Sequence, residues 1–395
     1  MLWLLAVGAL LNNVGLSFVW PINSIYIHEE LGRSLTVAGV VLFLHSGAGA
    51  LGQMAGGWLY DRVGARPILL TGLILASGSI CLPAVFASWP LYVAVMITFG
   101  FAVNLCVPAV QSLAAQVWPE GGRRAFNFIY VANNAGVAVG TAVGGIVAQR
   151  SFALAFQMAS LLLFLYAVFA FIFIRPSRPE QAQDGEVLSE LSAVGGAERD
   201  AAQEPPVPWV PLVALFFGLL VLWLTYVQWQ GPVAVHMQDI GLPLSAYSVL
   251  WTLNGLLIVL GQPLLSLAVR IFRSLSSQMF VGTLLFACAF GVMLASDQYP
   301  AFAASMMLLT AGEMFLWPAV PAAVAKLSPP SRLGFFQGFI GGAVGIGRMT
   351  GPVLGGLLYD HLPYSYLLVS TMAILVVPAV CFAIYTMHSP AEQRH

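Results

Sequence analysis

The chain has 395 residues, of which 59% are hydrophobic and only 8% are charged, and its formal net charge is −1 at neutral pH. A soluble globular domain carries about 25% charged residues, so this composition excludes an ordinary soluble protein. The mean hydropathy of +0.87 predicts a polytopic membrane protein in contact with the lipid bilayer. The near-neutral charge gives no sign of nucleic acid binding, and we expect no nucleic acid partner.

Twelve segments of the chain are long and apolar enough to cross a membrane, which takes about 20 residues. In chain order they are residues 2–27, 35–58, 67–87, 90–113, 127–149, 152–174, 209–231, 244–268, 277–295, 300–325, 334–358 and 364–387. No basic residue precedes the first segment, and it is too long for a secretory signal, so we interpret it as a retained first helix.

The basic residues predict the orientation, because cytoplasmic loops are enriched in lysine and arginine. With both termini in the cytoplasm, the outer loops hold only Arg33 and Arg150. The inner loops and tails then hold twelve basic residues: Arg62, Arg66, Arg123, Arg124, Arg175, Arg178, Arg199, Arg270, Arg273, Lys326, Arg332 and Arg394. We therefore expect a multi-pass protein of a bacterial-type plasma (inner) membrane with cytoplasmic termini.

The chain divides into two halves around residues 175–208, which carry seven acidic residues and few large apolar ones. We interpret this stretch as a cytoplasmic linker without chemistry of its own. The expected organisation is an N-terminal six-helix bundle (1–174), the linker, a C-terminal six-helix bundle (209–388) and a short tail (389–395). The four cysteines lie in apolar segments with no disulfide or metal spacing, so we expect no metal site and no cofactor.

The halves repeat each other. Residues 136–145 read GVAVGTAVGG and residues 347–356 read GRMTGPVLGG, in corresponding segments, each after a basic turn. Glycines spaced by four allow another helix to approach closely. Tight packing alone is one reading, and a seam that stays sealed while two bundles rock is the other. The residues concerned are Gly136, Gly140, Gly144, Gly145, Gly347, Gly351, Pro352, Gly355 and Gly356. Such repeats are typical of transporters with a binding site at the midplane.

The turn after the second segment, GGWLYDRVGARP from Gly56 to Pro67, resembles the signature loop of the major facilitator superfamily. That pattern is G-x-x-x-D-[RK]-x-G-[RK]-[RK], and the chain departs from it at Ala65. It matches at Gly57, Asp61, Arg62, Gly64 and Arg66. The resemblance covers essentially the whole chain apart from the linker. It implies an all-α polytopic fold with twelve transmembrane helices in two pseudosymmetric six-helix bundles, and a cytoplasmic gate at this turn.

Within that superfamily, the glycine motif is similar to the antiporter motif G-x-x-x-G-P-x-x-G-G of twelve-span drug:proton antiporters. The fifth segment has Thr141 in place of the proline, and the eleventh has Pro352. Those antiporters also carry an arginine four residues before a glycine in the fourth segment. Here Met96 precedes Gly100, so the coupling role of that arginine is in doubt.

Asp61 falls at the cytoplasmic end of the second segment. Its carboxylate is placed to cap the positively polarised start of a neighbouring helix, which by pseudosymmetry is the eleventh. Such a contact would close an inner gate in one state and break in the other. An ordinary salt bridge within the cytoplasmic loop is the alternative.

Glu313 is the only acidic residue in the middle of any segment, and a charged side chain there costs roughly 2.5–3.5 kcal/mol on insertion scales. We interpret it as the proton-coupling carboxyl group. Arg348 is the only basic residue at mid-depth, and counting from the segment ends places it within roughly 5 Å of the depth of Glu313. The two could form a switchable ion pair or a purely structural one. His45 is the only histidine inside a segment, and it is a candidate for proton traffic or an ordinary hydrogen-bonded side chain.

The cavity should combine amide and aromatic side chains, which suit apolar or weakly polar molecules better than sugars. The predicted lining residues are Asn12, Asn13, Trp20, Asn104, Gln111, Tyr226, Gln228, Thr310 and Trp317. Trp20, Trp229 and Trp251 could instead belong to the aromatic belt at the membrane surface, where we place Trp229.

These features favour a secondary active transporter, a monomer that exchanges protons for amphipathic small molecules or drugs by alternating access. Uptake, or transport of lipids or anionic metabolites with Arg348 binding the anion, is the alternative on the same fold. A transport-inactive receptor or scaffold is less favoured. No nucleophile–base pair or phosphate-binding loop indicates an enzyme, so we name no catalytic residue.

Overall fold

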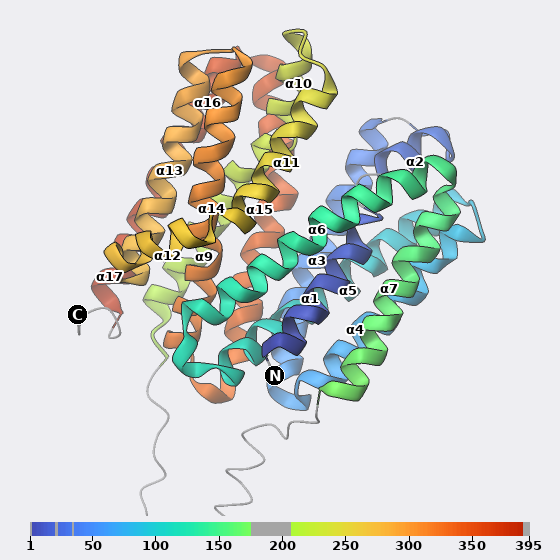
Figure 1. Cartoon of the computed structure of the whole chain (residues 1–395), viewed down its shortest axis with the longest axis horizontal. Helices are drawn as coiled ribbons and strands as arrows, with labels where there is room; N and C mark the ends of the chain where they lie inside the picture. Colours follow the sequence, from blue (N-terminus) through green and yellow to red (C-terminus); the bar gives the residue numbers. More distant parts are fainter. Residues whose placement is uncertain (1, 20–22, 34, 175–206, 390–395) are drawn as a thin grey trace, which may run out of the picture.

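The computed structural model describes residues 2–19, 23–33, 35–174 and 207–389, and over these ranges it is helical without strands. The predicted linker and tail lie outside the described residues, apart from residues 207, 208 and 389. The same holds for Trp20. The helices fall into two groups, one on each side of the molecule (Figure 1).

The first group follows the first six predicted segments. Its helices are α1 (Leu2–Ser17), α2 (Asn23–Glu29), α3 (Leu35–Val63), α4 (Ala65–Cys81), α5 (Trp89–Val117), α6 (Arg123–Arg150) and α7 (Phe152–Phe173), with 3-10 turns η1 (Leu82–Ala84) and η2 (Pro119–Gly121). Its buried side chains form one hydrophobic core, which runs from Leu5 to Ile174.

The second group follows the last six segments. Its helices are α9 (Trp209–Tyr226), α10 (Pro232–Asp239), α11 (Leu244–Leu260), α12 (Gln262–Ile271), α13 (Leu275–Ala295), α14 (Tyr299–Leu327), α15 (Leu333–His361), α16 (Tyr364–Ile374) and α17 (Val376–His388), with 3-10 turns η3 (Val227–Trp229) and η4 (Pro330–Arg332). A second core runs from Leu212 to Tyr385, and Phe126 of the first group belongs to it.

Length and hydropathy alone give fewer than twelve spans. Nine helices of the described chain are long and apolar enough to cross a membrane, or ten when α11 and α12, which meet at 63°, count as one broken span. The remaining two predicted segments correspond to α1 and α15. At 16 residues α1 is short, and the glycines and Arg348 of α15 lower its hydropathy. The bend between α11 and α12 falls at Gly261, just before Pro263, where a helix is expected to break.

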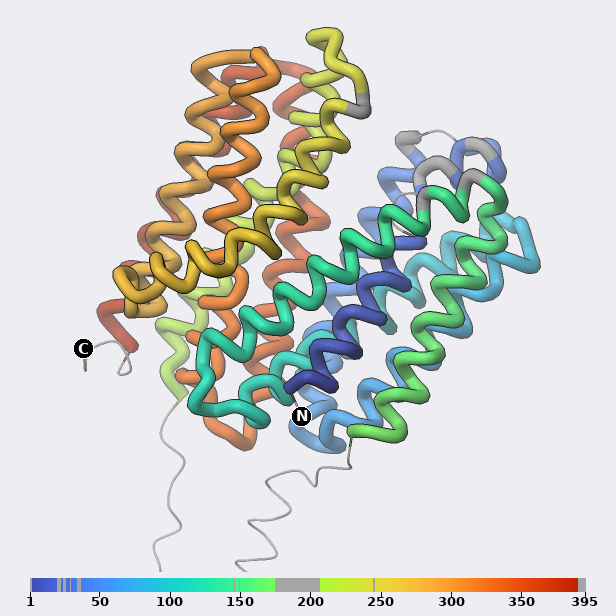
Figure 2. Tube along the Cα trace, in the orientation of Figure 1, coloured from blue at the N-terminus to red at the C-terminus, as the bar shows by residue number. Residues whose placement is uncertain are grey.

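The two groups converge at the end where α7 ends and α9 begins, on either side of the predicted linker in the sequence, and they spread apart toward α2 and α10 (Figures 1 and 2). We call this convergent end the linker side. The α3–α4 turn lies there, because Nη2 of Arg66 donates a hydrogen bond of 2.7 Å to the carbonyl of Phe171 near the end of α7. Across the groups, α3 packs against α15, and α6 packs against α11 and α14.

Candidate functional site

A cavity of about 440 Å³ lies between the two groups of helices. Helices α1, α3, α5 and α6 line one wall, and α9, α14 and α15 line the other. Most of the predicted lining residues reach it: Asn12, Asn13, Asn104, Gln111, Tyr226 and Trp317. The cavity therefore lies where a repeat transporter is expected to bind its substrate.

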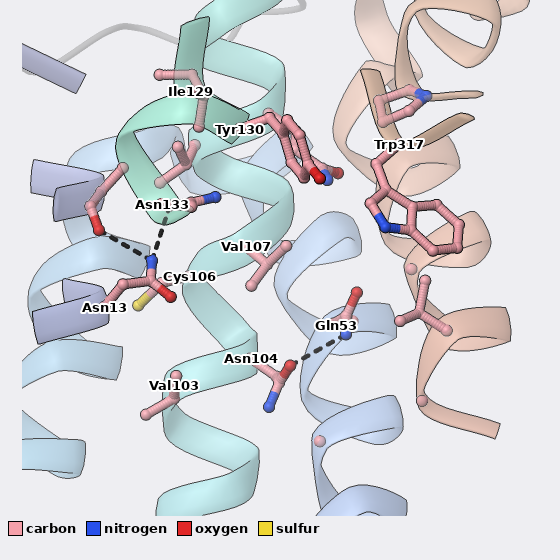
Figure 3. Close-up of a pocket in the computed structure, with 18 of the residues that line it drawn as sticks. Asn13, Gln53, Val103, Asn104, Cys106, Val107, Ile129, Tyr130, Asn133 and Trp317 are labelled. Atoms are coloured by element: carbon pink, nitrogen blue, oxygen red, sulfur yellow. Dashed lines mark hydrogen bonds between the residues drawn. The ribbon is translucent and has the colours of Figure 1, made fainter. Parts of the chain in front are cut away.

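The wall of the first group is rich in amides. Nδ2 of Asn13 donates to Oδ1 of Asn133 at 2.7 Å, and Nε2 of Gln53 donates to Oδ1 of Asn104 at 3.0 Å (Figure 3). Each bond uses one donor and one acceptor, so these amides keep further polar atoms for a bound molecule.

The opposite wall is aromatic. The rings of Trp223 and Trp317 stack with centroids 4.9 Å apart and planes inclined by 14°. Tyr226 meets Trp317 edge-on at 5.7 Å, and the guanidinium carbon of Arg348 lies 5.4 Å from the ring centroid of Trp223. This wall presents a flat apolar surface with one cation beside it, opposite the amides.

Glu313 lies at the centre of α14, with fourteen residues of the helix on either side. Its side chain is only 3% exposed. Nδ2 of Asn254 donates to one carboxyl oxygen at 2.8 Å, and the hydroxyl of Tyr130 donates to the other at 3.3 Å. Tyr130 belongs to the first group, so the buried carboxyl group joins the two halves of the molecule.

Arg348 and His45 line the same cavity. The described hydrogen bonds of Glu313 come from Asn254 and Tyr130, and the described ring contact of Arg348 is with Trp223, so the interaction of Glu313 with Arg348 stays a prediction. His45 is buried, and its Nδ1 donates to the carbonyl of Met96 at 2.9 Å. Met96 stands where the drug:proton antiporters have their arginine, and its backbone carbonyl thus holds the ring of His45 in place.

Two predicted lining residues face away from the cavity. Gln228 is 2% exposed, and its Nε2 donates to the carbonyls of Leu224 and Gly351, which ties α9 to α15. Thr310 is 0% exposed and accepts a hydrogen bond from Asn254 behind Glu313. Trp229 is 0% exposed, so its expected place in a membrane-surface belt is wrong.

Tyr130 and Asn254 were not predicted from the sequence. Asn254 stands alone in the apolar run WTLNGLLIVL, and a polar residue inside a span is costly enough to signal a role. Tyr130 carries no such signal, because tyrosines are ordinary in membrane helices.

On the linker side, Asp61 caps α15. Its two carboxylate oxygens accept hydrogen bonds from the backbone N–H groups of Gly334 at 2.8 Å and Phe335 at 2.7 Å. This is the contact with the start of the eleventh segment that the sequence predicts. Gly57 lies against the backbone of Gly334 and Gly338, leaving no room for a Cβ atom on any of the three. Here α3 and α15 touch through their backbones.

The other motif residues stabilise the first group itself. The guanidinium of Arg62 lies 3.7 Å over the ring of Trp58 in its own helix. The described hydrogen bonds of the gate to α15 come from Asp61, and a role of Arg62 in the gate stays a prediction. Gly64 has a φ of 78°, a left-handed conformation that favours glycine, in the α3–α4 turn. Arg66 ties that turn to α7, as described above.

The two glycine motifs line close helix contacts within each group. A Cβ atom on Gly140 would lie 2.7 Å from both the carbonyl oxygen of Val14 and Cβ of Ser17 in α1. Gly136 and Gly144 also face α1, and Gly347, Gly351 and Gly355 face α9 or the turn after it. The fifth segment thus packs on the first as the eleventh packs on the seventh. Gly356 has open space around it, and Pro352 is exposed.

A cavity between two repeated helical bundles, closed at one end by backbone contact, defines a membrane transporter of the alternating-access class. The family model of the Major Facilitator Superfamily matches residues 5–265 and 228–395. The chain therefore belongs to the major facilitator superfamily of transporters.

Known relatives agree with this assignment. The chain is 43% identical to the uncharacterised MFS-type transporter YttB of Bacillus subtilis over 385 residues, covering 97% of the chain and 94% of YttB. It is 26% identical to the multidrug resistance protein MdtH of Aeromonas hydrophila, covering 91% and 87% of the two chains. The human organic anion transporter MFSD10 has the same fold, with a TM-score of 0.75 and 16% identity over 96% of this chain and 98% of that one.

Proposed function

We propose that this transporter expels amphipathic small molecules from a bacterial cell in exchange for protons, with Glu313 as the proton carrier. The observation that carries this proposal is a single carboxyl group, buried at mid-span, that lines the cavity and bonds to both halves of the molecule. A charged side chain at this depth costs roughly 2.5–3.5 kcal/mol on insertion scales, which favours a role beyond joining the two halves. The multidrug resistance name of MdtH, a relative over most of the chain, supports the substrate class.

Alternating access in this proposal is a rocking of residues 1–174 against residues 209–388 about the α3–α15 and α6–α14 contacts. With the linker side in the cytoplasm, as the basic residues favour, the described conformation is closed toward the cytoplasm. The amide wall and the aromatic wall belong to opposite halves, so a bound molecule contacts both. Rocking then changes the side of the membrane to which the cavity, and the molecule bound in it, is open.

One acidic residue is energetically sufficient for this exchange. A proton that crosses 100 mV releases about 2.3 kcal/mol, and a tenfold gradient of a neutral solute costs about 1.4 kcal/mol. One proton per molecule therefore sustains a gradient of about 40-fold.

The test is transport by purified protein in proteoliposomes under an imposed pH gradient, over a panel of amphipathic compounds. Glu313→Gln should bind substrate in equilibrium dialysis yet fail to accumulate it against a gradient. Glu120→Gln is the matched control, because Glu120 is exposed in the η2 turn, and it should transport as wild type does. Full pH-driven transport by Glu313→Gln would refute the proposal.

A second candidate is transport of anionic amphipaths, and the position of Arg348 favours it. Its guanidinium carbon lies 5.4 Å from the ring centroid of Trp223, which stacks on Trp317. An aromatic carboxylate could place its carboxylate group against Arg348 and its ring system against Trp223 and Trp317. Binding of a fluorescent aromatic carboxylate, compared with its methyl ester, separates the two candidates. Preference for the acid, lost in Arg348→Gln, supports the second.

A further inference from the structure

One face of α6 reaches across to the other group of helices at the linker side. Arg123, Asn127 and Tyr130 are spaced by four and three residues and so share this face. Nη2 of Arg123 donates to the carbonyl of Met314 at 2.6 Å, and Nδ2 of Asn127 donates to Oε1 of Gln262 at 2.8 Å. Tyr130 donates to Glu313, as described above. We call these three residues the α6 latch.

The acceptor of Arg123 exists because of a proline. In an α-helix the carbonyl of residue i accepts from the N–H of residue i+4. For Met314 that residue is Pro318, which has no N–H, although α14 continues through it. The carbonyl of Met314 is thereby free to accept from a side chain, and the arginine of the other group occupies it.

The acceptor of Asn127 also lies at a helix irregularity. Gln262 follows Gly261 at the 63° bend between α11 and α12. Its own Nε2 donates to the carbonyl of Ile258, one turn earlier. Two of the three latch contacts therefore fall at places where helices of the second group depart from regular geometry.

The guanidinium of Arg123 makes few described hydrogen bonds. Nε of Arg123 is buried and has no hydrogen-bond partner among the described residues. The guanidinium is thus held to α14 by one described hydrogen bond rather than by a carboxylate fork. A single hydrogen bond costs less to break than a bidentate ion pair, which suits a contact that must break once in every transport cycle.

We infer that Arg123 is a positioning residue that links proton binding at Glu313 to closure of the linker side. This inference rests on the proposed function. Met314 directly follows Glu313, so a shift of this segment moves the acceptors of Arg123 and Tyr130 together. The bond from Tyr130 is stronger to an ionised carboxylate than to a neutral carboxyl group. Ionised Glu313 then favours the closed latch, and a proton loosens it.

The direction agrees with proton-for-substrate exchange. A proton that reaches Glu313 from the side opposite the linker weakens the latch, opens the linker side, and is released there when substrate enters. Tyr130 of α6 and Tyr226 of α9 face Glu313. Arg348 of α15 and His45 of α3 are the other titratable or charged groups that line the same cavity. We therefore expect the pH dependence of linker-side opening to arise from this cluster of groups and to act through the α6 latch.

The experiment measures opening of the linker side against pH by double electron–electron resonance in proteoliposomes. Spin labels replace Glu120 in the first group and Lys326 in the second, both of which are exposed, with the native cysteines changed to alanine. In wild type the open fraction rises as the pH falls. Arg123→Ala should raise the open-to-closed ratio about tenfold or more, as loss of a hydrogen bond to a charged group does, and move the midpoint about one pH unit upward.

Three variants make the outcome decisive. Arg124→Ala is the matched control, because Arg124 is the exposed neighbour, and it should behave as wild type. Arg123→Lys keeps a charged donor and should recover part of the shift. Pro318→Ala supplies the missing N–H to Met314 and should move the midpoint in the direction of Arg123→Ala, which tests the latch even if that variant fails to fold.

The two failures are distinguishable. A midpoint and ratio unchanged in both Arg123→Ala and Pro318→Ala, while Glu313→Gln abolishes the pH response, overturns the latch and leaves the proposed function standing. A pH response that persists in Glu313→Gln overturns the proposed function whatever the arginine variants do.

Discussion

Replacing Asp61 by asparagine should shift the transporter toward the state that is open on the linker side. In the described conformation both carboxylate oxygens accept backbone hydrogen bonds at the start of α15, at 2.8 and 2.7 Å. Asparagine keeps one acceptor oxygen and turns an –NH₂ group toward the other N–H. The substitution therefore removes one hydrogen bond and the negative charge from a contact between the two groups of helices.

The magnitude follows from these two losses. A hydrogen bond to a charged group contributes about 1.5–3 kcal/mol, and a negative charge at a helix start contributes about 0.3–1 kcal/mol. Part of the first value remains with the asparagine oxygen, so we expect a net loss of about 2 kcal/mol. That corresponds to a rise of roughly 30-fold in the open-to-closed ratio.

The assay is cysteine accessibility from the linker side. Ala114 lines the cavity near the end of α5 and is fully buried, so Ala114→Cys should be labelled by an impermeant maleimide only when the linker side opens. Asp61→Asn should accelerate labelling in proportion to the open fraction. The control is Asp360→Asn, an exposed acid at the far end of α15, which should not. An unchanged labelling rate in Asp61→Asn would show that the cap does not hold the gate.

Two further predictions concern the cavity and its packing. Gly140→Leu should abolish transport while the protein still inserts, because its Cβ atom alone would lie 2.7 Å from the backbone of Val14. The control Gly356→Leu, at a position with open space around it, should transport normally. Wild-type activity in Gly140→Leu would contradict the close contact. Arg348→Ala should move the transport–pH profile to higher pH, because removing a positive charge from the cavity makes proton binding at Glu313 easier, and Arg348→Lys should restore it only partly. An unmoved profile would show that the two residues are not coupled through the cavity.

The sequence by itself determined the membrane class, the helical segments and the position of the buried acid. Water is absent from a bilayer core, so each crossing must be an apolar helix about 20 residues long. That requirement is local and can be read from composition. The cap by Asp61 was also predictable, because the pseudosymmetry of the two halves places the start of the eleventh segment beside the turn after the second. Glu313 could be singled out because a mid-span carboxyl group is costly wherever the helix happens to face.

Only the tertiary structure decided which face of each helix looks into the cavity. Lipid tails and a protein interior are equally apolar, so hydropathy does not separate the buried face of a membrane helix from the lipid face. The sequence therefore did not show that Gln228 and Thr310 point away from the cavity, or that Trp229 is buried in the core. The hydrogen-bond partners of Glu313 come from α6 and α11, far away in the chain. Which donors reach a buried carboxyl group depends on how the helices pack together, and no spacing along one helix contains that information.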